Sequence, residues 1–261
     1  MMRIIGYLFL FLIAFVVTVV WKFPAAGVLP HVSTHPVAVA GVSGSIWSGS
    51  AQQVQLPNPA LLANNVKWRF QPAALMSGNT AANLDFDILG GSGNGNVARS
   101  ITSGDVTVTD GSFRMPAVNL GQFLPLPIVD FGGNLVADIE TLELQNNLLK
   151  STRSTVIWRN AEVTGALQAA LGQVVVDVVP QPIDGKPAHI ATLSSKDGDL
   201  ELDGEVQIDI NGNYRADIKL KPTATANQGL TGALGSLGSI AGRESDGSYR
   251  IRNNGNIRNL M

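Results

Sequence analysis

The sequence has no cysteine and little charge, and each absence removes classes of function. Without cysteine, the chain forms no disulfide and offers neither a thiolate nucleophile nor a cysteine-ligated metal site. Charged residues make up 15% of the 261 positions, and the formal net charge is −2. The chain therefore lacks the strongly basic character of proteins that bind nucleic acid. Its 45% hydrophobic content, with 28 glycines and 13 prolines, is typical of an ordered, turn-rich protein.

Long apolar runs are also scarce, and the one exception lies near the N-terminus. Ile4–Trp21 is an apolar segment of roughly 18 residues, which is near the lower limit for a helix that crosses a bilayer core. Arg3 precedes this segment, and Lys22 and Pro24 follow it. Aromatic and cationic side chains suit the membrane interface, and proline ends a helix. The segment therefore predicts a single transmembrane anchor.

A cleaved signal peptide is the alternative, because Ala25-Ala26 offers a weak cleavage site. A signal peptide has a shorter apolar core of about 7–15 residues, so the length favours an uncleaved anchor. No cationic cluster follows the segment, so its N-terminal side is expected in the cytoplasm. We therefore expect residues 1–3 to be cytoplasmic, 4–21 to form the anchor, 22–40 to form a linker that leads into a sheet, and 41–261 to form one β domain outside the cytoplasm.

Beyond the anchor, apolar and polar residues alternate, which is the pattern of a strand with one buried and one solvated face. The clearest alternating segments are Leu84–Ile88, Asp105–Thr109, Val206–Ile210, Ala216–Leu220 and Tyr249–Arg252. Asn-Gly and Asp-Gly pairs supply the positive φ angles that tight hairpins need. These pairs are Asp110-Gly111, Asn211-Gly212 and Asn254-Gly255, with further turn signals at Asp184-Gly185, Asp197-Gly198, Asp203-Gly204 and Asp246-Gly247. Strands joined by tight turns predict an antiparallel meander.

Helix signals are sparse and short. Pro72 suits the first turn of a helix that Gly78 would end. Leucines recur near helical spacing after Leu230, but the glycines among them weaken any long helix. Val174–Val179 is apolar on both faces and is expected to be a central or covered strand. We predict an all-β fold, an elongated and strongly twisted or curled antiparallel sheet with short helical caps, either a β-groove or jelly-roll-like.

Motifs for catalysis and metal binding are incomplete. The glycine-rich segment Gly90–Gly95 lacks the spacing of a phosphate-binding loop, and no helix follows it. His31 and His35 are four residues apart, but prolines flank them and the glutamate of zinc proteases is missing between them. The sequence therefore predicts no catalytic, cofactor-binding or metal-binding residues, and the chain is not expected to be an enzyme.

A series of strand and turn motifs runs in order through almost the whole chain. The motifs are Val42–Gly49, Val66–Phe70 with Pro72 and Leu75–Gly78, Gly93–Val97, Gly104–Val108, Val156–Ala161, Asp197–Gly204 and Asp246–Ile251. Each motif is a simple strand-turn pattern. Their order and spacing together, with the N-terminal anchor, resemble the N protein of bacterial type II secretion systems.

The resemblance implies a single-pass protein of the inner membrane with most of its chain in the periplasm. It implies an accessory or assembly component that acts by protein–protein contacts between the inner-membrane platform and the secretin. The family also looks like a relative of AsmA-type envelope proteins, whose long sheets form grooves that hold lipid chains. An alternative function is therefore a lipid-binding envelope protein that holds acyl chains in a β-groove. A third alternative is an envelope protein outside secretion, because fold does not fix function.

Three tryptophans are the candidate site residues of the β domain. Trp47, Trp68 and Trp158 lie in alternating or tight-turn segments, where a large ring can seal the inner face of a curved sheet. We interpret them as structural core residues. The alternative is that one of them lines a groove for lipid or peptide.

Overall fold

The computed structural model of the protein describes residues 38–56, 61–122, 129–145, 148–165, 168–236 and 242–256. The predicted anchor, residues 4–21, and the two linker histidines lie outside the described residues. Within the described ranges, no helix combines the length and hydropathy needed to span a membrane.

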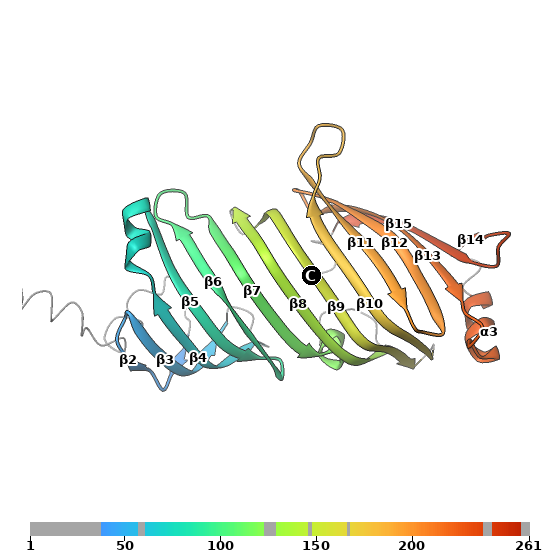
Figure 1. The fold of residues 1–261 in the computed structure, drawn as a ribbon, viewed down its shortest axis with the longest axis horizontal. Coiled ribbons are helices and arrows are strands. Elements are labelled where there is room, and N and C mark those ends of the chain that lie inside the picture. Colours follow the sequence, from blue (N-terminus) through green and yellow to red (C-terminus); the bar gives the residue numbers. More distant parts are fainter. Residues whose placement is uncertain are drawn as a thin grey trace, which may run out of the picture.

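A single antiparallel sheet holds all fifteen strands of the described residues (Figure 1). The strands are β1 (Val39–Ala40), β2 (Ser43–Gly44), β3 (Ser48–Gln55), β4 (Leu62–Phe70), β5 (Asn79–Ile88), β6 (Gly91–Ser100), β7 (Val106–Pro116), β8 (Val129–Gln145), β9 (Leu148–Gly165), β10 (Ala169–Pro180), β11 (Ala188–Lys196), β12 (Leu200–Asp209), β13 (Asn213–Pro222), β14 (Gly242–Arg243) and β15 (Tyr249–Asn256). From β3 to β13 each strand pairs with the next in sequence, and β15 then pairs with β13.

This order confirms the predicted all-β antiparallel meander. Of the two predicted forms, β-groove and jelly-roll-like, it corrects the second. A jelly roll needs two sheets and strands that return beside distant neighbours. Here the strands stay in one open sheet in sequence order, so the jelly-roll-like alternative is wrong for the described part of the chain. The strand expected at Val174–Val179 is central, since β10 lies between β9 and β11.

Three short helices occur in the described ranges, η1 (Pro72–Ser77), η2 (Ala117–Gln122) and α3 (Gln228–Ser236). The two predicted signals delimit η1, because Pro72 lies in its first turn and Gly78 ends it with a φ of 73°. Asn227 caps α3, because its Oδ1 accepts the Leu230 N–H at 2.8 Å. The expectation of short helical caps is confirmed.

Four of the predicted turn pairs connect strands, and three do not. Asp110-Gly111, Asp203-Gly204 and Asn254-Gly255 lie inside β7, β12 and β15. At Asp110 the positive φ of 51° forms a β-bulge, where the register of β6 and β7 shifts. Gly255 instead allows a close approach, because a Cβ atom there would lie 2.9 Å from the ring of Tyr214.

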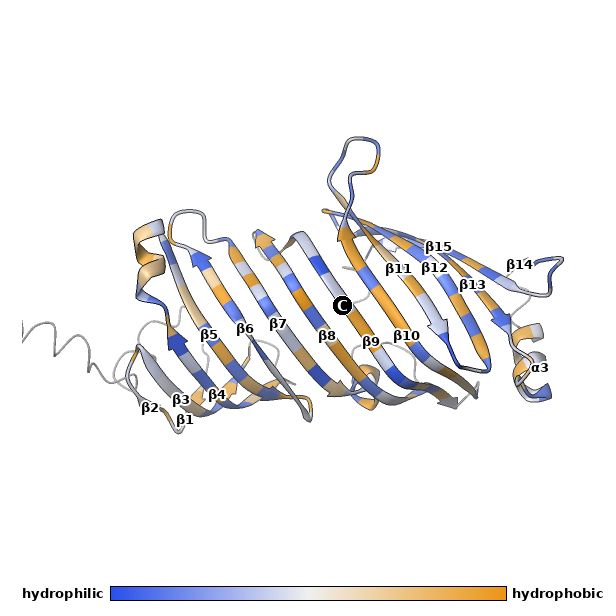
Figure 2. Ribbon diagram, viewed as in Figure 1, coloured by the Kyte–Doolittle hydropathy of each residue, from blue (hydrophilic) through white to orange (hydrophobic). Residues whose placement is uncertain are grey.

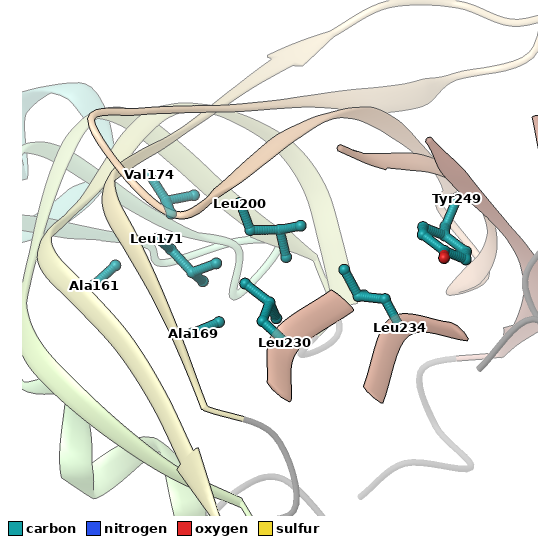
Figure 3. Packing of buried hydrophobic residues seen from close by; sticks show 8 residues of the cluster. All are labelled: Ala161, Ala169, Leu171, Val174, Leu200, Leu230, Leu234 and Tyr249. Atoms are coloured by element: carbon teal, nitrogen blue, oxygen red, sulfur yellow. The ribbon is translucent and has the colours of Figure 1, made fainter. Parts of the chain in front are cut away.

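The hydrophobic core lies where the sheet curves around α3 (Figure 3). Side chains from β9, β10, β12 and β15 converge on the helix, and the cluster consists of Ala161, Ala169, Leu171, Val174, Leu200, Leu230, Leu234 and Tyr249. Leu230 and Leu234 come from the helix and are 1% and 0% exposed. They are four residues apart and therefore share the helix face that packs on the sheet.

Replacement of Leu234 by alanine should leave a cavity in this core and lower the free energy of unfolding by about 2–5 kcal/mol. Urea denaturation followed by tryptophan fluorescence measures the loss, since Trp158 packs beside the cluster. Gln228→Ala, at an exposed position of the same helix, is the matched control and should change stability little. Equal midpoints for L234A and Q228A would show that α3 does not pack on the sheet in solution.

Candidate functional site

The register of the strands aligns apolar residues in a row across the sheet, which we call the apolar row. Its members lie opposite one another from β5 to β15 and are Phe86, Gly93, Phe113, Ala137, Val156, Val176, Leu193, Gly204, Ile218 and Ile251. Every member is apolar or glycine. With strands about 4.8 Å apart, the row is about 43 Å long.

The adjacent residues on the same strands form a polar row on the opposite face of the sheet. Its members run from β3 to β15 and are Ser50, Lys67, Asp85, Asn94, Ser112, Asp138, Thr155, Asp177, Thr192, Glu205, Asp217 and Arg252. Successive side chains of a strand point to opposite faces, so the two rows define an apolar and a polar face. Figure 2 shows the resulting alternation of hydrophobic and hydrophilic residues along the strands.

The apolar face is only partly covered within the described ranges. α3 packs on its C-terminal part, and all described strands belong to the one sheet, so no second sheet packs on the remainder. Apart from the buried Gly93, each member of the apolar row is half-buried. A continuous row of partly exposed apolar side chains can serve as a site of interaction. This face is therefore the candidate site.

Phe86 and Phe113 show how the apolar row is packed. Their rings are stacked with centroids 6.4 Å apart, on the two strands that flank Gly93. A Cβ atom at Gly93 would lie 2.6 Å from Phe86 Cζ. Glycine is required here because the two rings close over the β6 backbone.

The structure places all three predicted tryptophans half-buried, and two of them at one end of the sheet. The ring of Trp47 packs edge-on against Phe70, with centroids 5.2 Å apart. Trp68 lies opposite Leu84 on the apolar face, and its Nε1 donates to the Ser45 carbonyl at 3.2 Å.

Trp158 lies farther along the same face, beside the core. It is opposite Leu135 and Val174, its ring is 5.9 Å from that of Phe131, and its Nε1 donates to the Gly132 carbonyl at 2.7 Å. These contacts hold the indole in place. Whether Trp158 or either of the other tryptophans lines a groove stays a prediction.

His189 is a buried polar residue that belongs to no sequence motif. It is 1% exposed, and its Nε2 accepts the Thr152 N–H at 3.2 Å. Burial lowers the pKa of the imidazole, so the ring is neutral and carries its proton on Nδ1. Nδ1 has no hydrogen-bond partner among the described residues. Pro180 lies opposite His189 and has no N–H, so the ring joins β9 to β11 at the end of β10.

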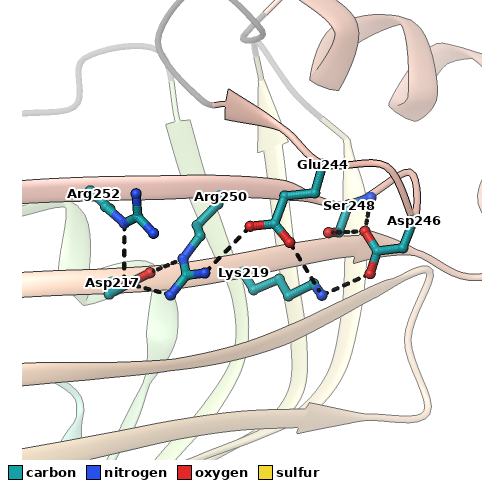
Figure 4. A network of polar contacts seen from close by, with 7 residues as sticks. All are labelled: Asp217, Lys219, Glu244, Asp246, Ser248, Arg250 and Arg252. Carbon is teal, nitrogen blue, oxygen red and sulfur yellow. Dashed lines mark hydrogen bonds and ion pairs between the residues drawn. The ribbon is translucent and has the colours of Figure 1, made fainter.

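A network of charged side chains on the polar face joins β15 to β13 (Figure 4). The Arg250 guanidinium donates two hydrogen bonds to the Asp217 carboxylate, at 2.6 and 2.8 Å. Arg252 Nε reaches the same carboxylate at 3.2 Å. Lys219 Nζ lies 2.7 Å from Asp246 and therefore ties the turn before β15 to β13. The network holds the last long strand in place on the sheet.

These pairs shift the ionisation of both partners. Hydrogen bonds from Arg250 lower the pKa of Asp217 from 3.8 to about 2, and the same contact raises the pKa of Arg250. Hydrogen bonds from Lys219 and Ser248 lower the pKa of Asp246. The groups are partly exposed, so solvent and salt screen each pair.

The polar face contains a hollow with charged side chains in its lining. This hollow, of about 820 Å³ near the β10–β11 connection, is lined by Lys186, Asp209 and Arg215, among others. Within the part of the chain that the structure describes, no group of three histidine, aspartate or glutamate side chains could hold a metal ion.

Acid should weaken the attachment of β15 through Asp217. Its pKa is lower in the folded chain, so its contribution is complete above its ordinary value of 3.8 and is lost as the pH falls through about 2. Asp217→Asn should lower the thermal midpoint at about pH 5 and reduce the further loss between about pH 5 and pH 2. Asp138→Asn, an exposed position of the polar row, should lose stability with acid as the wild type does. A wild-type acid loss in D217N would show that the contact with Arg250 is not formed in solution.

Comparison with known proteins gives one match. Residues 35–252, which run from before β1 into β15, match the family described as type II secretion system (T2SS), protein N. No curated protein and no solved structure matches the chain. The family match covers most of the sequence and nearly all of the described sheet, including the strands that carry the apolar and polar rows. The chain therefore belongs to the type II secretion system protein N family.

Proposed function

We propose that the chain is an accessory or assembly component of a type II secretion system that works by protein–protein contacts in the periplasm. Its family makes it a component of such a system. In this proposal residues 4–21 anchor the chain in the inner membrane, and the β domain, 41–261, contacts both the inner-membrane platform and the secretin. The observation that supports a contact role is that most of the outer edge of β15 pairs with no other described strand.

The outer edge of β15 is unpaired over most of its described length. β14 pairs only with Tyr249 and Arg250, and no other described strand pairs with the outer side from Ile251 to Gly255. An uncovered strand edge presents backbone donors and acceptors that a partner strand can bind. The ion pairs of Asp217 with Arg250 and Arg252 join this edge strand to β13.

The opposite edge of the sheet is less suited to strand addition. Two short strands cover parts of β3 there, β1 opposite Gln53 and Val54, and β2 opposite Gly49 and Ser50. Only a short stretch of β3 lies between them. The β15 edge is therefore the better docking site for an extended segment of a secretion subunit.

A photo-crosslinking amino acid at Asn254 should capture the secretin or a platform subunit in cells that assemble the secretion system. Asn254 is exposed and lies on the uncovered edge strand. Asn94, an exposed residue of the polar row on the central strand β6, is the matched control. Crosslinks of equal yield from both positions, or none from Asn254, would contradict docking at this edge.

A second candidate function is the binding of acyl chains along the apolar row. The supporting observation is the half-buried apolar row, which carries no polar side chain across ten strands and which, within the described ranges, α3 and its core cover only in its C-terminal part. Apolar chains that settle on such a face would bury surface at about 25 cal/mol per Å². In this alternative the protein is a lipid-binding envelope protein and secretion partners are secondary.

Acyl-chain binding can be tested at two neighbouring positions that lie on opposite faces of the sheet. Val156 belongs to the apolar row and Thr155 to the polar row, and the chain has no native cysteine. Fluorophores attached to Val156→Cys should be quenched by phospholipids with a spin label in the acyl chain, and those on Thr155→Cys should not. Equal quenching at both positions, or none at Val156→Cys, would rule out an acyl-chain site on the apolar row.

A further inference from the structure

A group of exposed apolar side chains, which we call the knob, projects from one end of the sheet. It belongs neither to the apolar and polar rows nor to the β15 edge. It consists of Leu75 and Met76 of η1 and Ile101 of the adjacent turn between β6 and β7. These side chains are 44%, 93% and 59% exposed. In Figure 1, η1 is the teal coil beside β5, at the end of the sheet farthest from α3. Large apolar side chains gathered on one projection indicate a surface that meets an apolar partner.

Hydrogen bonds make the knob an ordered feature. The Ile101 N–H donates to the Gly78 carbonyl at 3.0 Å and joins the two connections. The Gly78 N–H in turn donates to the Leu75 carbonyl at 3.1 Å, and Ser77 Oγ donates to the Ala74 carbonyl at 2.9 Å. The exposed side chains are therefore held in place by the backbone that carries them.

Charge is absent from the knob and present just behind it. The sequence has no charged residue from 71 to 83 or from 100 to 104. Arg69 and Arg99 are exposed immediately before these two connections, and the half-buried Asp105 follows the second. Trp47, which packs against Phe70, also lies at this end of the sheet. The apolar side chains of the knob would contact acyl chains, and the aromatic pair and the arginines would lie at the level of the anionic head groups. This is the order in which such residues are found at a lipid interface.

The linker is long enough to bring the knob to the membrane of the predicted anchor. Residues 22–38 can span at most about 58 Å when extended. The chain joins the sheet at β1, which pairs with Gln53 and Val54 of β3, beside the start of β4, whereas η1 follows the other end of β4. A strand of the length of β4 covers about 30 Å, so a knob at the membrane leaves β1 within reach of the anchor. The exposed arginines before both connections complement an anionic surface.

We propose that the knob of Leu75, Met76 and Ile101 inserts into the surface of an anionic lipid bilayer. The inference rests on the proposed anchor, because the anchor defines which bilayer lies within reach. The β domain is then held to the membrane at two points, the anchor and the knob. The C-terminal end of the sheet, with the uncovered edge of β15, lies at the other end of the molecule from this contact.

The test uses the full-length protein in vesicles of phosphatidylethanolamine and phosphatidylglycerol, with one fluorophore on Met76→Cys. The position is 93% exposed, so the substitution removes no packing. Ser245→Cys, exposed in the turn before β15, is the control. Spin-labelled lipid should quench the fluorophore at 76 roughly twofold more than the one at 245, and aqueous iodide should show the reverse order.

Two results would overturn the proposal. Iodide quenching at 76 that equals quenching at 245 would place the knob in water. Protection of the fluorophore at 76 from both iodide and lipid quenchers would show that protein, such as a second copy of the chain, covers it. Crosslinking from Asn254 to secretion subunits is independent of either result, so a failure of this proposal is distinguishable from a failure of the proposed function.

Two pairs of substitutions test the apolar and the cationic parts of the knob separately. One pair adds negative charge to the apolar side chains, and the other removes the positive charge beside them. Leu75→Glu with Ile101→Glu, both at exposed positions, should restore iodide quenching at 76 because carboxylates resist transfer into the interface. Arg69→Gln with Arg99→Gln should reduce lipid quenching in the anionic vesicles and change little in neutral phosphatidylcholine. Lipid quenching that neither pair of substitutions alters would contradict insertion by the knob.

Discussion

The register of the backbone hydrogen bonds is the constraint on which the structure depends. Side chains alternate between faces, so a slip of one residue in any pair of strands would move apolar side chains to the polar face. The apolar and polar rows cross the sheet without such a slip because bulges absorb the irregularities. Positive φ angles at Asn65, Asp110 and Asn160 accompany shifts in the pairing of β4 with β5, β6 with β7 and β8 with β9. The two-faced character of the protein follows from this register.

A single open sheet leaves surfaces accessible that the second sheet of a β-sandwich would bury. A second layer would cover the apolar face, yet in the described ranges α3 packs on only its C-terminal part. No described strand pairs with the outer side of β15 from Ile251 to Gly255, and the ion pairs around Asp217 and Lys219 hold this strand to β13 on the polar side. Family membership makes the chain a component of type II secretion, which implies contacts with other secretion subunits. The proposed roles assign secretion subunits to the β15 edge, lipid chains to the apolar row and the bilayer surface to the knob.

The sequence predicted those features that depend on neighbours along the chain. Alternation in Leu84–Ile88 and the apolar run Val174–Val179 identified strands, and Pro72 with Gly78 marked a short helix. Asp110-Gly111 was misread as a turn because a hairpin and a bulge use the same positive φ. Local signals also could not separate one open sheet from a jelly roll, because that choice depends on which strands pair.

Features that join distant residues were not predictable from the sequence. The bond between Thr152 and His189 spans 37 positions, and that between Asp217 and Arg250 spans 33. The apolar row depends on register across every strand pair, so no local pattern reveals it. The tryptophans were found as candidates by residue type, and the structure gives their contacts while their role in a groove remains a prediction.

The central claim, that the open sheet serves secretion through protein partners, is tested most directly by affinity purification of the full-length protein from gently solubilised native membranes. Mass spectrometry of the purified material should identify both proteins and lipids. The account predicts secretin or inner-membrane platform subunits in stoichiometric yield, with lipid incidental. A stoichiometric lipid without secretion subunits would contradict it and favour acyl-chain binding on the apolar face.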